Sequence, residues 1–129
     1  MAVREWLERF RDEVVTVDAR VSRELEVTRH LLAHPSVPVH FRDLDGFEAV
    51  GNLWSTRDRI ARAMNLPREK LIDAIGDAQR HPEDVTLVDR ADFFANESAD
   101  FDLLDSPVPK FYPGDAGRYI TAGVWVAEW

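Results

Sequence analysis

Cysteine is absent from the 129-residue sequence, and lysine occurs only as Lys70 and Lys110. The lack of cysteine excludes disulfide frameworks, thiolate metal sites and cysteine nucleophiles. No run of apolar residues approaches the roughly 20 that a membrane-spanning helix requires. The charged first ten residues also lack the apolar core of a secretory signal peptide. These absences predict a soluble, cytoplasmic protein with no membrane partner.

A shortage of positive charge excludes a second class of partner. The 16 basic residues are outnumbered by 24 acidic ones, which gives a formal net charge of −8 and a pI near 4.9. A surface of this sign repels phosphate backbones, so the sequence predicts no nucleic-acid partner. The apolar content of 45% is ordinary for a globular protein, and a chain of this length can bury a core without disulfides or metals.

Alternating helical and strand patterns predict a small α/β domain, with a mixed sheet covered by helices, in the first part of the chain. The expected elements are a helix over residues 3–10, a strand over 13–18, a helix from an N-cap at Ser22 to about His34, a strand over 37–41, and a hairpin partner over 47–50 after the Asp45-Gly46 turn. Helix and strand periods both recur within about 50 residues, which favours a mixed α/β fold.

The second half begins with two expected helices. Residues 55–58 resemble a capping box, and the helix that follows carries Ile60, Ala61 and Met64 on one face. Pro67 suits the first turn of the next helix. The buried stripe predicted for that helix consists of Leu71, Ile72, Ile75 and Ala78. A short strand is expected over residues 85–88.

From residue 89 to 110 the pattern loosens, which predicts a linker that packs its aromatic residues on the preceding domain. Pro113 and Gly114 match the central positions of a type II turn. Residues 119–126 then alternate as a two-faced strand. A strand needs a neighbour to pair with, so this one either returns to the N-terminal domain or pairs with another polypeptide. Self-association into a homo-oligomer through its exposed edge is the alternative.

Clusters of chemically active residues are few. Glu26, His30 and His34 share one helical face with the spacing of zinc ligands, which raises the hypothesis of a metal-dependent hydrolase. The general-base glutamate of the His-Glu-x-x-His pattern is missing, so a solvated helix face is the favoured interpretation. His40 is interpreted as a strand residue at a packing boundary. From the residues alone, we assign no catalytic residue and no metal ligand.

Four segments, in chain order, resemble the N-terminal region of UbiD-type decarboxylases. They are REWLERFRDEVVTVD, RELEVTRHLL, PVHFRDLDGFEAVGNLWSTRDRIARAM and YPGDAGRYITAGVWV. The resemblance implies an N-terminal α/β domain over residues 1–106. It also implies the first strand of a split-barrel flavin-binding domain, incomplete here, over residues 107–129. Members of this family use prenylated FMN with a divalent metal (Mn²⁺ or Mg²⁺) to decarboxylate α,β-unsaturated or aromatic acids.

By this resemblance, Thr121, Ala122 and Gly123 are the cofactor-binding residues, and the missing side chain of Gly123 would let a planar ring approach the backbone. The family's acid-base residues and metal ligands are expected beyond Trp129. The resemblance therefore implies a part or split subunit of a decarboxylase that is inactive alone, with the remainder of the enzyme or a partner subunit as its partner. A non-catalytic binding or assembly module is the alternative. An isoprenoid precursor and an aromatic acid both remain open as the substrate.

Overall fold

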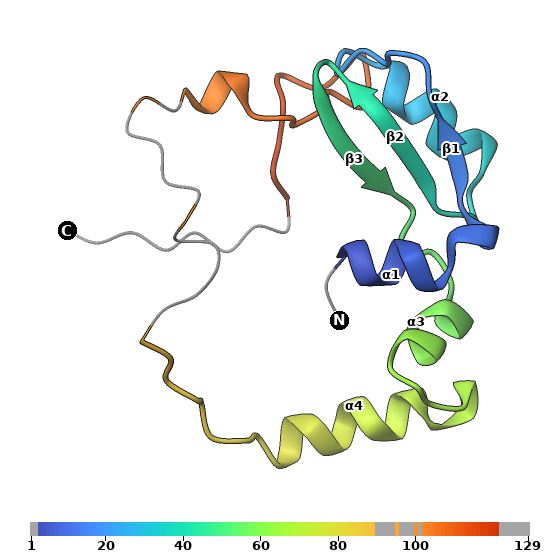
Figure 1. Cartoon of the computed structure of the whole chain (residues 1–129), viewed down its shortest axis with the longest axis vertical. Coiled ribbons are helices and arrows are strands. Elements are labelled where there is room, and N and C mark those ends of the chain that lie inside the picture. Colours follow the sequence, from blue (N-terminus) through green and yellow to red (C-terminus); the bar gives the residue numbers. More distant parts are fainter. Residues whose placement is uncertain (1–2, 90–94, 96–99, 101, 122–129) are drawn as a thin grey trace. The chain divides into compact units, whose positions relative to one another are not determined.

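The structure, a computed structural model, describes residues 3–89, 95, 100 and 102–121 (Figure 1). It contains two compact units. Unit 1 comprises residues 1–55 and 107–129, and unit 2 comprises residues 56–106. The units are defined by spatial compactness alone, so the division into domains over 1–106 and 107–129 stays a prediction.

Unit 1 contains a three-stranded mixed sheet, which confirms the predicted fold class. Its strands are β1 (Val15–Val17), β2 (Val39–Leu44) and β3 (Phe47–Gly51), in the order β1-β2-β3. β1 pairs with β2 in parallel, and β3 pairs with β2 in antiparallel orientation. The parallel pair requires a crossover, and helix α2 (Glu26–Ala33) lies in it (Figure 1).

The hairpin between β2 and β3 forms where the Asp-Gly pair predicts it. Asp45 and Gly46 have φ values of 49° and 91°, the left-handed conformations that a two-residue hairpin turn needs. The Asp43 carboxylate accepts a 2.7 Å hydrogen bond from the Gly46 amide. Local turn chemistry therefore fixes the register of the two strands.

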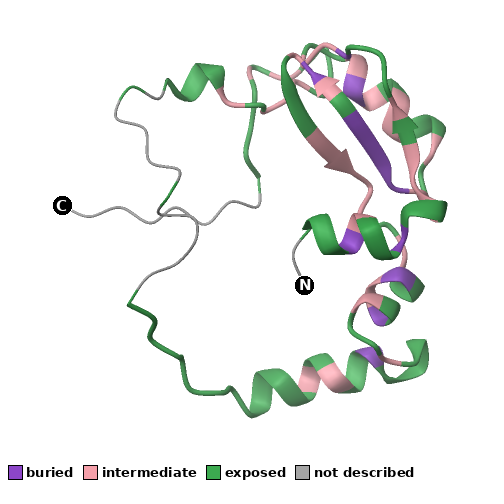
Figure 2. Cartoon of the chain, viewed as in Figure 1, coloured by how far each residue is buried: buried purple, intermediate pink, exposed green. Residues whose placement is uncertain are grey.

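The core of unit 1 lies between α2 and one face of the sheet. Its buried members are Val21, Val27, Val39, Phe41 and Leu44, and Figure 2 shows this burial concentrated on β2. A second cluster surrounds Trp6 on helix α1 (Val3–Arg9), where the indole packs 4.7 Å from the Phe10 ring and 5.9 Å from the Trp54 ring. A 3₁₀ turn (Arg11–Glu13) then leads into β1.

Unit 2 contains helices α3 (Arg57–Ala63) and α4 (Leu71–Arg80), with 3₁₀ turns at Arg68–Lys70 and Leu103–Asp105. Thr56 caps α3, because its hydroxyl accepts a hydrogen bond from the Arg59 amide. The predicted start at Ser55 is therefore one residue early. Ala61 is buried on this helix, whereas Met64, expected on the same buried face, is 48% exposed.

The predicted apolar stripe of α4 is wrong except at its first residue. Leu71 is buried, but Ile72, Ile75 and Ala78 are exposed (Figure 2). The strand predicted over residues 85–88 is also not formed, since no part of the described chain pairs with it. The α4 prediction rests on apolar periodicity, which shows that a face is apolar but not what covers it.

The second predicted helix also starts later than expected. α2 begins at Glu26, and Leu25 before it has a left-handed φ of 69°. Ser22 is not the N-cap, because its hydroxyl accepts from the Glu24 amide, while its own amide donates to the Glu26 carboxylate.

The described residues contain no helix long and apolar enough to cross a membrane.

Candidate functional site

The segment that leads to the predicted cofactor residues is held against residues 23–25, just before α2. We call residues 110–121 the anchored segment. The Lys110 amide donates to the Arg23 carbonyl at 2.9 Å, and the Lys110 carbonyl accepts from the Leu25 amide at 3.0 Å. These bonds form a parallel bridge between Glu24 and Lys110. Residues 23–25 are therefore used for strand-like pairing, which is why α2 cannot begin at Ser22.

Two further contacts order the anchored segment. The Thr28 hydroxyl, on the first turns of α2, donates to the Phe111 carbonyl at 2.6 Å. Tyr112 and Asp115 then close a turn, with the Asp115 amide donating to the Tyr112 carbonyl at 3.1 Å and the Asp115 carboxylate accepting from the Tyr112 amide at 3.0 Å. Gly114 does not have a positive φ, so the turn forms as predicted but is not of type II.

Arg118 fixes the far part of the anchored segment. Its Nε and Nη2 atoms lie 3.0 and 2.6 Å from Oε1 of Glu24. Sequence analysis placed both residues inside motifs, Glu24 in RELEV and Arg118 in GDAGR, but assigned no role to either. The structure brings the two motifs together through this ion pair.

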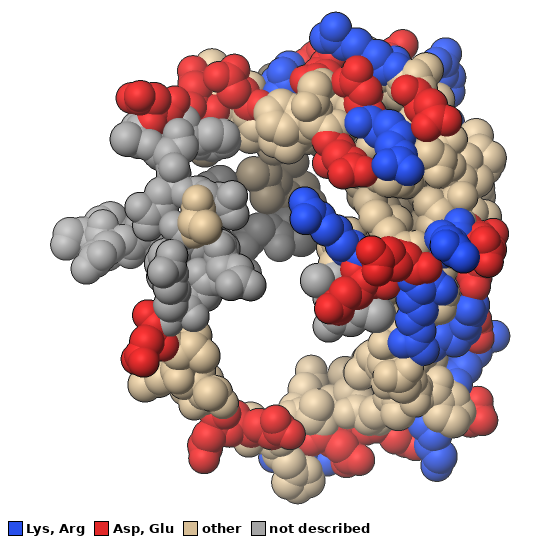
Figure 3. All heavy atoms as spheres, in the orientation of Figure 1, with Lys and Arg blue, Asp and Glu red and all other residues tan. Residues whose placement is uncertain are grey.

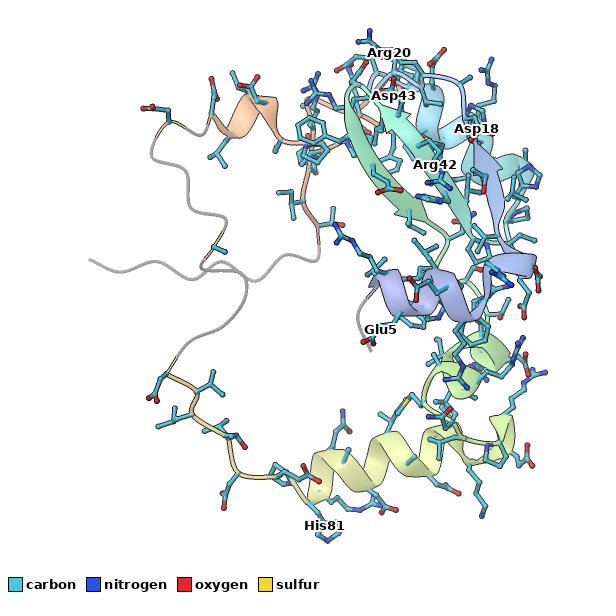
Figure 4. All side chains as sticks on the ribbon, viewed as in Figure 1. Glu5, Asp18, Arg20, Arg42, Asp43 and His81 are labelled. Atoms are coloured by element: carbon cyan, nitrogen blue, oxygen red, sulfur yellow. The ribbon has the colours of Figure 1, made fainter. Side chains whose placement is uncertain are left out.

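Asp45, in the turn between β2 and β3, binds two arginine residues that precede α2. Oδ1 of Asp45 accepts from Arg20, with Nη2 at 3.0 Å, and Oδ2 accepts from the Arg23 backbone amide at 2.8 Å. The hydrogen bond from the Arg23 amide, and then that from Arg20, lower the pKa of the Asp45 carboxyl. The Arg23 peptide thus joins the hairpin turn on one side to Lys110 on the other. Arg20 and Asp43 lie at this end of the sheet in Figure 4.

The predicted cofactor residues lie at and beyond the end of the described chain. Thr121 is exposed, and Ala122 and Gly123 lie outside the described residues. The predicted strand over residues 119–126 is not formed at Tyr119, Ile120 or Thr121, and the rest of it also lies outside the described residues. The structure therefore places one predicted site residue, at the exposed end of the anchored segment.

The structure does not assemble the alternative metal site. Glu26 accepts from the Ser22 amide, and the His30 ring packs edge-on against Phe41 at 5.7 Å. Within the part of the chain that is described, no three His, Cys, Asp or Glu side chains lie close enough to hold a metal ion. The hydrolase hypothesis built on Glu26, His30 and His34 therefore has no geometric support.

His40 is buried on β2, which confirms that it is a strand residue at a packing boundary. Its Nε2 atom lies 2.7 Å from Oε1 of Glu48 on β3, and Arg42 lies 3.6 Å from the same oxygen. This cross-strand network stabilises the hairpin on the face of the sheet opposite the core. Figure 3 shows basic side chains beside acidic ones in the part of the view that holds the sheet, and acidic ones alone around the Leu103–Asp105 turn.

Unit 2 contains a cavity of about 320 Å³, lined by Arg57, Arg68, Glu69, Leu71 and Ile72. None of these residues belongs to the anchored segment. Thr121, which the resemblance assigns to the flavin, is exposed and does not line this cavity. The described residues also supply no three-ligand metal site. A prenylated flavin and its metal would need residues beyond those described.

Two sequence profiles of known protein domains match this chain. A sequence profile of the 3-octaprenyl-4-hydroxybenzoate carboxy-lyase N-terminal domain matches residues 5–79. A profile of the Rift-related domain of the same carboxy-lyase matches residues 86–129. The two matches follow one another along the chain and together include both motifs joined by Glu24 and Arg118.

Two relatives are anhydromevalonate phosphate decarboxylases. The protein from Methanothermobacter thermautotrophicus is 29% identical over 128 residues, which cover 98% of this chain and 30% of that protein. The protein from Methanocaldococcus jannaschii is 30% identical over 109 residues, which cover 83% of this chain and 26% of that protein. This chain thus spans less than a third of the length of the relatives it matches.

The fold is shared with solved structures of HmfF from Pelotomaculum thermopropionicum, a UbiD-class enzyme. The complex with FMN matches with a TM-score of 0.81 and 27% identity, over 93% of this chain and 29% of HmfF. An evolved dimeric form in complex with prFMN matches with a TM-score of 0.82 and 26% identity, over 94% and 30% of the two chains. Because the N-terminal-domain profile matches more than half of the sequence and the fold agrees, the chain belongs to the UbiD family of carboxy-lyases.

Proposed function

We propose that this chain supplies the N-terminal part of a UbiD-type carboxy-lyase, which decarboxylates an α,β-unsaturated or aromatic acid with prenylated FMN. The observation that carries the proposal is the consecutive match of both carboxy-lyase domains, over residues 5–79 and 86–129. The resemblance of the fold to HmfF, which was solved with FMN and with prFMN, supports the flavin as cofactor.

In this proposal, unit 1 positions the end of the chain for the cofactor. The backbone bridge at Lys110 and the ion pair between Glu24 and Arg118 hold the anchored segment. Thr121, with Ala122 and Gly123 after it, would then approach the flavin or the substrate. Holding Thr121 on the anchored segment limits its motion, which favours a defined geometry at the reacting centre.

The acid-base residues and the metal ligands are proposed to lie outside these 129 residues. The relatives are more than three times as long as the part they share with this chain. The acid-base residues and the ligands of the Mn²⁺ or Mg²⁺ ion would come from that remainder, either on the same polypeptide or on a partner subunit. The present residues alone should therefore not decarboxylate.

The preferred substrate is an α,β-unsaturated acid of the anhydromevalonate phosphate kind. Four curated relatives carry that name, and the first of them matches 98% of this chain. An aromatic acid is the second choice, because the family profile is named for an aromatic-acid carboxy-lyase.

A chimera tests the function directly. This chain would replace the matching part of the M. thermautotrophicus relative, and the product would be co-expressed with a prenyl-flavin synthase. We expect flavin absorbance to co-purify with the chimera and CO₂ to be released from anhydromevalonate phosphate. The relative without its matching part, and this chain alone, are the controls and should both be inactive. A folded, flavin-loaded chimera that released no CO₂ from either substrate class would contradict the proposal.

A non-catalytic binding or assembly module is the second candidate. It is favoured by the hydrophobic core that unit 1 forms around Val21, Val27, Val39, Phe41 and Leu44. Such a module should unfold in one cooperative transition without a partner. If this chain is such a module, the chimera that contains it should release no CO₂.

A further inference from the structure

Among the described residues, the two most exposed large apolar side chains, Leu87 and Val85, lie in unit 2, shortly after α4. Val85, Leu87 and Val88 are 87%, 91% and 68% exposed. Together with Thr86 they form the 85–88 segment, in which three of four residues are β-branched. Side chains of this kind favour strands because they pack well on a pleated, half-buried surface. Nearly complete exposure is the opposite of that environment.

The backbone of the 85–88 segment is unpaired as well. None of its amides or carbonyls bonds to another residue in the described ranges. A β-prone segment with open backbone groups and exposed apolar side chains is a template for pairing with another strand. The segment therefore has both features that strand addition uses: hydrogen-bonding groups for affinity and side chains for packing.

The comparisons indicate what could pair with it. The Rift-related profile begins at residue 86 and runs to residue 129. The relatives extend far beyond the part that this chain matches. A strand of the remaining Rift-related domain would satisfy both the open backbone and the apolar side chains, since it belongs to the same domain as the segment.

From these observations we propose that the 85–88 segment is a strand of the Rift-related domain that forms only when the remainder of that domain pairs with it. The inference rests on the proposed function for the identity of the partner. It adds an assembly role for residues 85–88: they join the N-terminal part to the remainder, and they order only in the joined protein.

Hydrogen–deuterium exchange tests the pairing. The free chain and the chimera with the M. thermautotrophicus remainder would be compared under the same conditions. We expect amides 86–88 to exchange at near-unprotected rates in the free chain and on the order of 100-fold more slowly in the chimera. Amides of β2 serve as the internal control, because they should be protected in both. Rapid exchange at 86–88 in a chimera whose β2 is protected would overturn the proposal.

Proline substitution provides a second test. Thr86→Pro and Leu87→Pro remove amides at adjacent positions, and a strand with one neighbour directs alternate amides toward it, so at least one variant must break the pairing. We expect both variants to leave the unfolding midpoint of the free chain unchanged, and at least one to lower that of the chimera by several degrees. Thr86→Val keeps the amide and the β-branched shape, and it should behave like the parent in both. If neither proline variant affects the chimera, the proposal fails.

Three outcomes separate this proposal from pairing with a second copy and from the proposed function. If amides 86–88 become protected in the free chain as its concentration rises, a second copy is the partner, and the proposal is wrong. If the chimera protects the segment but releases no CO₂, the pairing stands and the proposed function fails. An active chimera with an unprotected segment gives the reverse result.

Discussion

Arg118 and Glu24, 94 positions apart in the sequence, are joined by two hydrogen bonds to a single carboxylate oxygen. The bonds measure 3.0 Å from Nε and 2.6 Å from Nη2. Glu24 also lies in the backbone bridge to Lys110. Residues 23–25, just before α2, therefore anchor the segment at two points. The Arg23 carbonyl and the Leu25 amide hold it at Lys110, and the Glu24 side chain holds it at Arg118.

Replacing Arg118 by alanine should loosen the anchored segment with little loss of global stability. Both side chains are partly exposed, and an ion pair of this kind contributes about 0.2–1 kcal/mol. We expect faster amide exchange over residues 112–121 and no change in β2. Arg80→Ala is the matched control, because Arg80 pairs with Asp77 at 2.6 Å within α4. If the two variants have the same effect on residues 112–121, Arg118 does not anchor that segment.

Asp45 should make the stability of unit 1 depend on pH in the acid range. Its pKa is lowered from the ordinary 3.8 by the Arg23 amide and Arg20. A lowered folded pKa means that its contribution to stability is present above about pH 3.8 and is lost as the pH falls through the folded value. Asp45→Asn should therefore lower the unfolding midpoint at pH 6, and the difference from the parent should shrink toward pH 2.5.

Asparagine suits this test because it tolerates the left-handed φ at position 45. Asp84→Asn is the control, since Asp84 is exposed and makes no ion pair within the described residues. Thermal unfolding followed by circular dichroism across the pH range measures both. A difference between parent and Asp45→Asn that stayed constant from pH 6 to 2.5 would show that the charge of Asp45 is not responsible.

Trp6 should dominate the second apolar cluster of unit 1. It is 1% exposed, and its indole N–H has no hydrogen-bond acceptor among the described residues. Trp6→Ala should cost about 3–5 kcal/mol of unfolding free energy. Trp6→Phe should cost clearly less, because it keeps a ring against Phe10 and removes the unsatisfied donor. Urea denaturation of the two variants gives the comparison, and equal losses would contradict it.

The sheet and its hairpin could be predicted because their signals are local. Asp45-Gly46 adopts the conformation that its residue types favour, and the β-branched and aromatic residues on either side favour strands. The α2 start could not be predicted in this way. Ser22 is a good cap by residue type, but Lys110 pairs with the backbone at Glu24 and displaces the start to Glu26.

The candidate site could be predicted only in part. The motifs containing Glu24 and Arg118 are visible in the sequence, but their contact is not, because the two residues are 94 positions apart. Thr121 was assigned by resemblance, and the structure shows it at the end of the described chain. Periodicity likewise marks the apolar residues of α4 without showing which of them a neighbour covers.

Leu71 and Ile72 test that distinction on adjacent residues of α4. Leu71 is 3% exposed and Ile72 is 64% exposed, although both belong to the stripe that periodicity predicts as buried. Leu71→Ala should lower the unfolding free energy by about 2–5 kcal/mol, because it removes buried methyl groups and leaves a cavity. Ile72→Ala should change it by less than about 0.5 kcal/mol, since an exposed substitution loses little packing and alanine is the better helix former. Urea denaturation of both variants, followed by helical circular dichroism, measures the difference. Equal losses would mean that Ile72 is covered in solution and that the stripe is buried as its sequence pattern indicates.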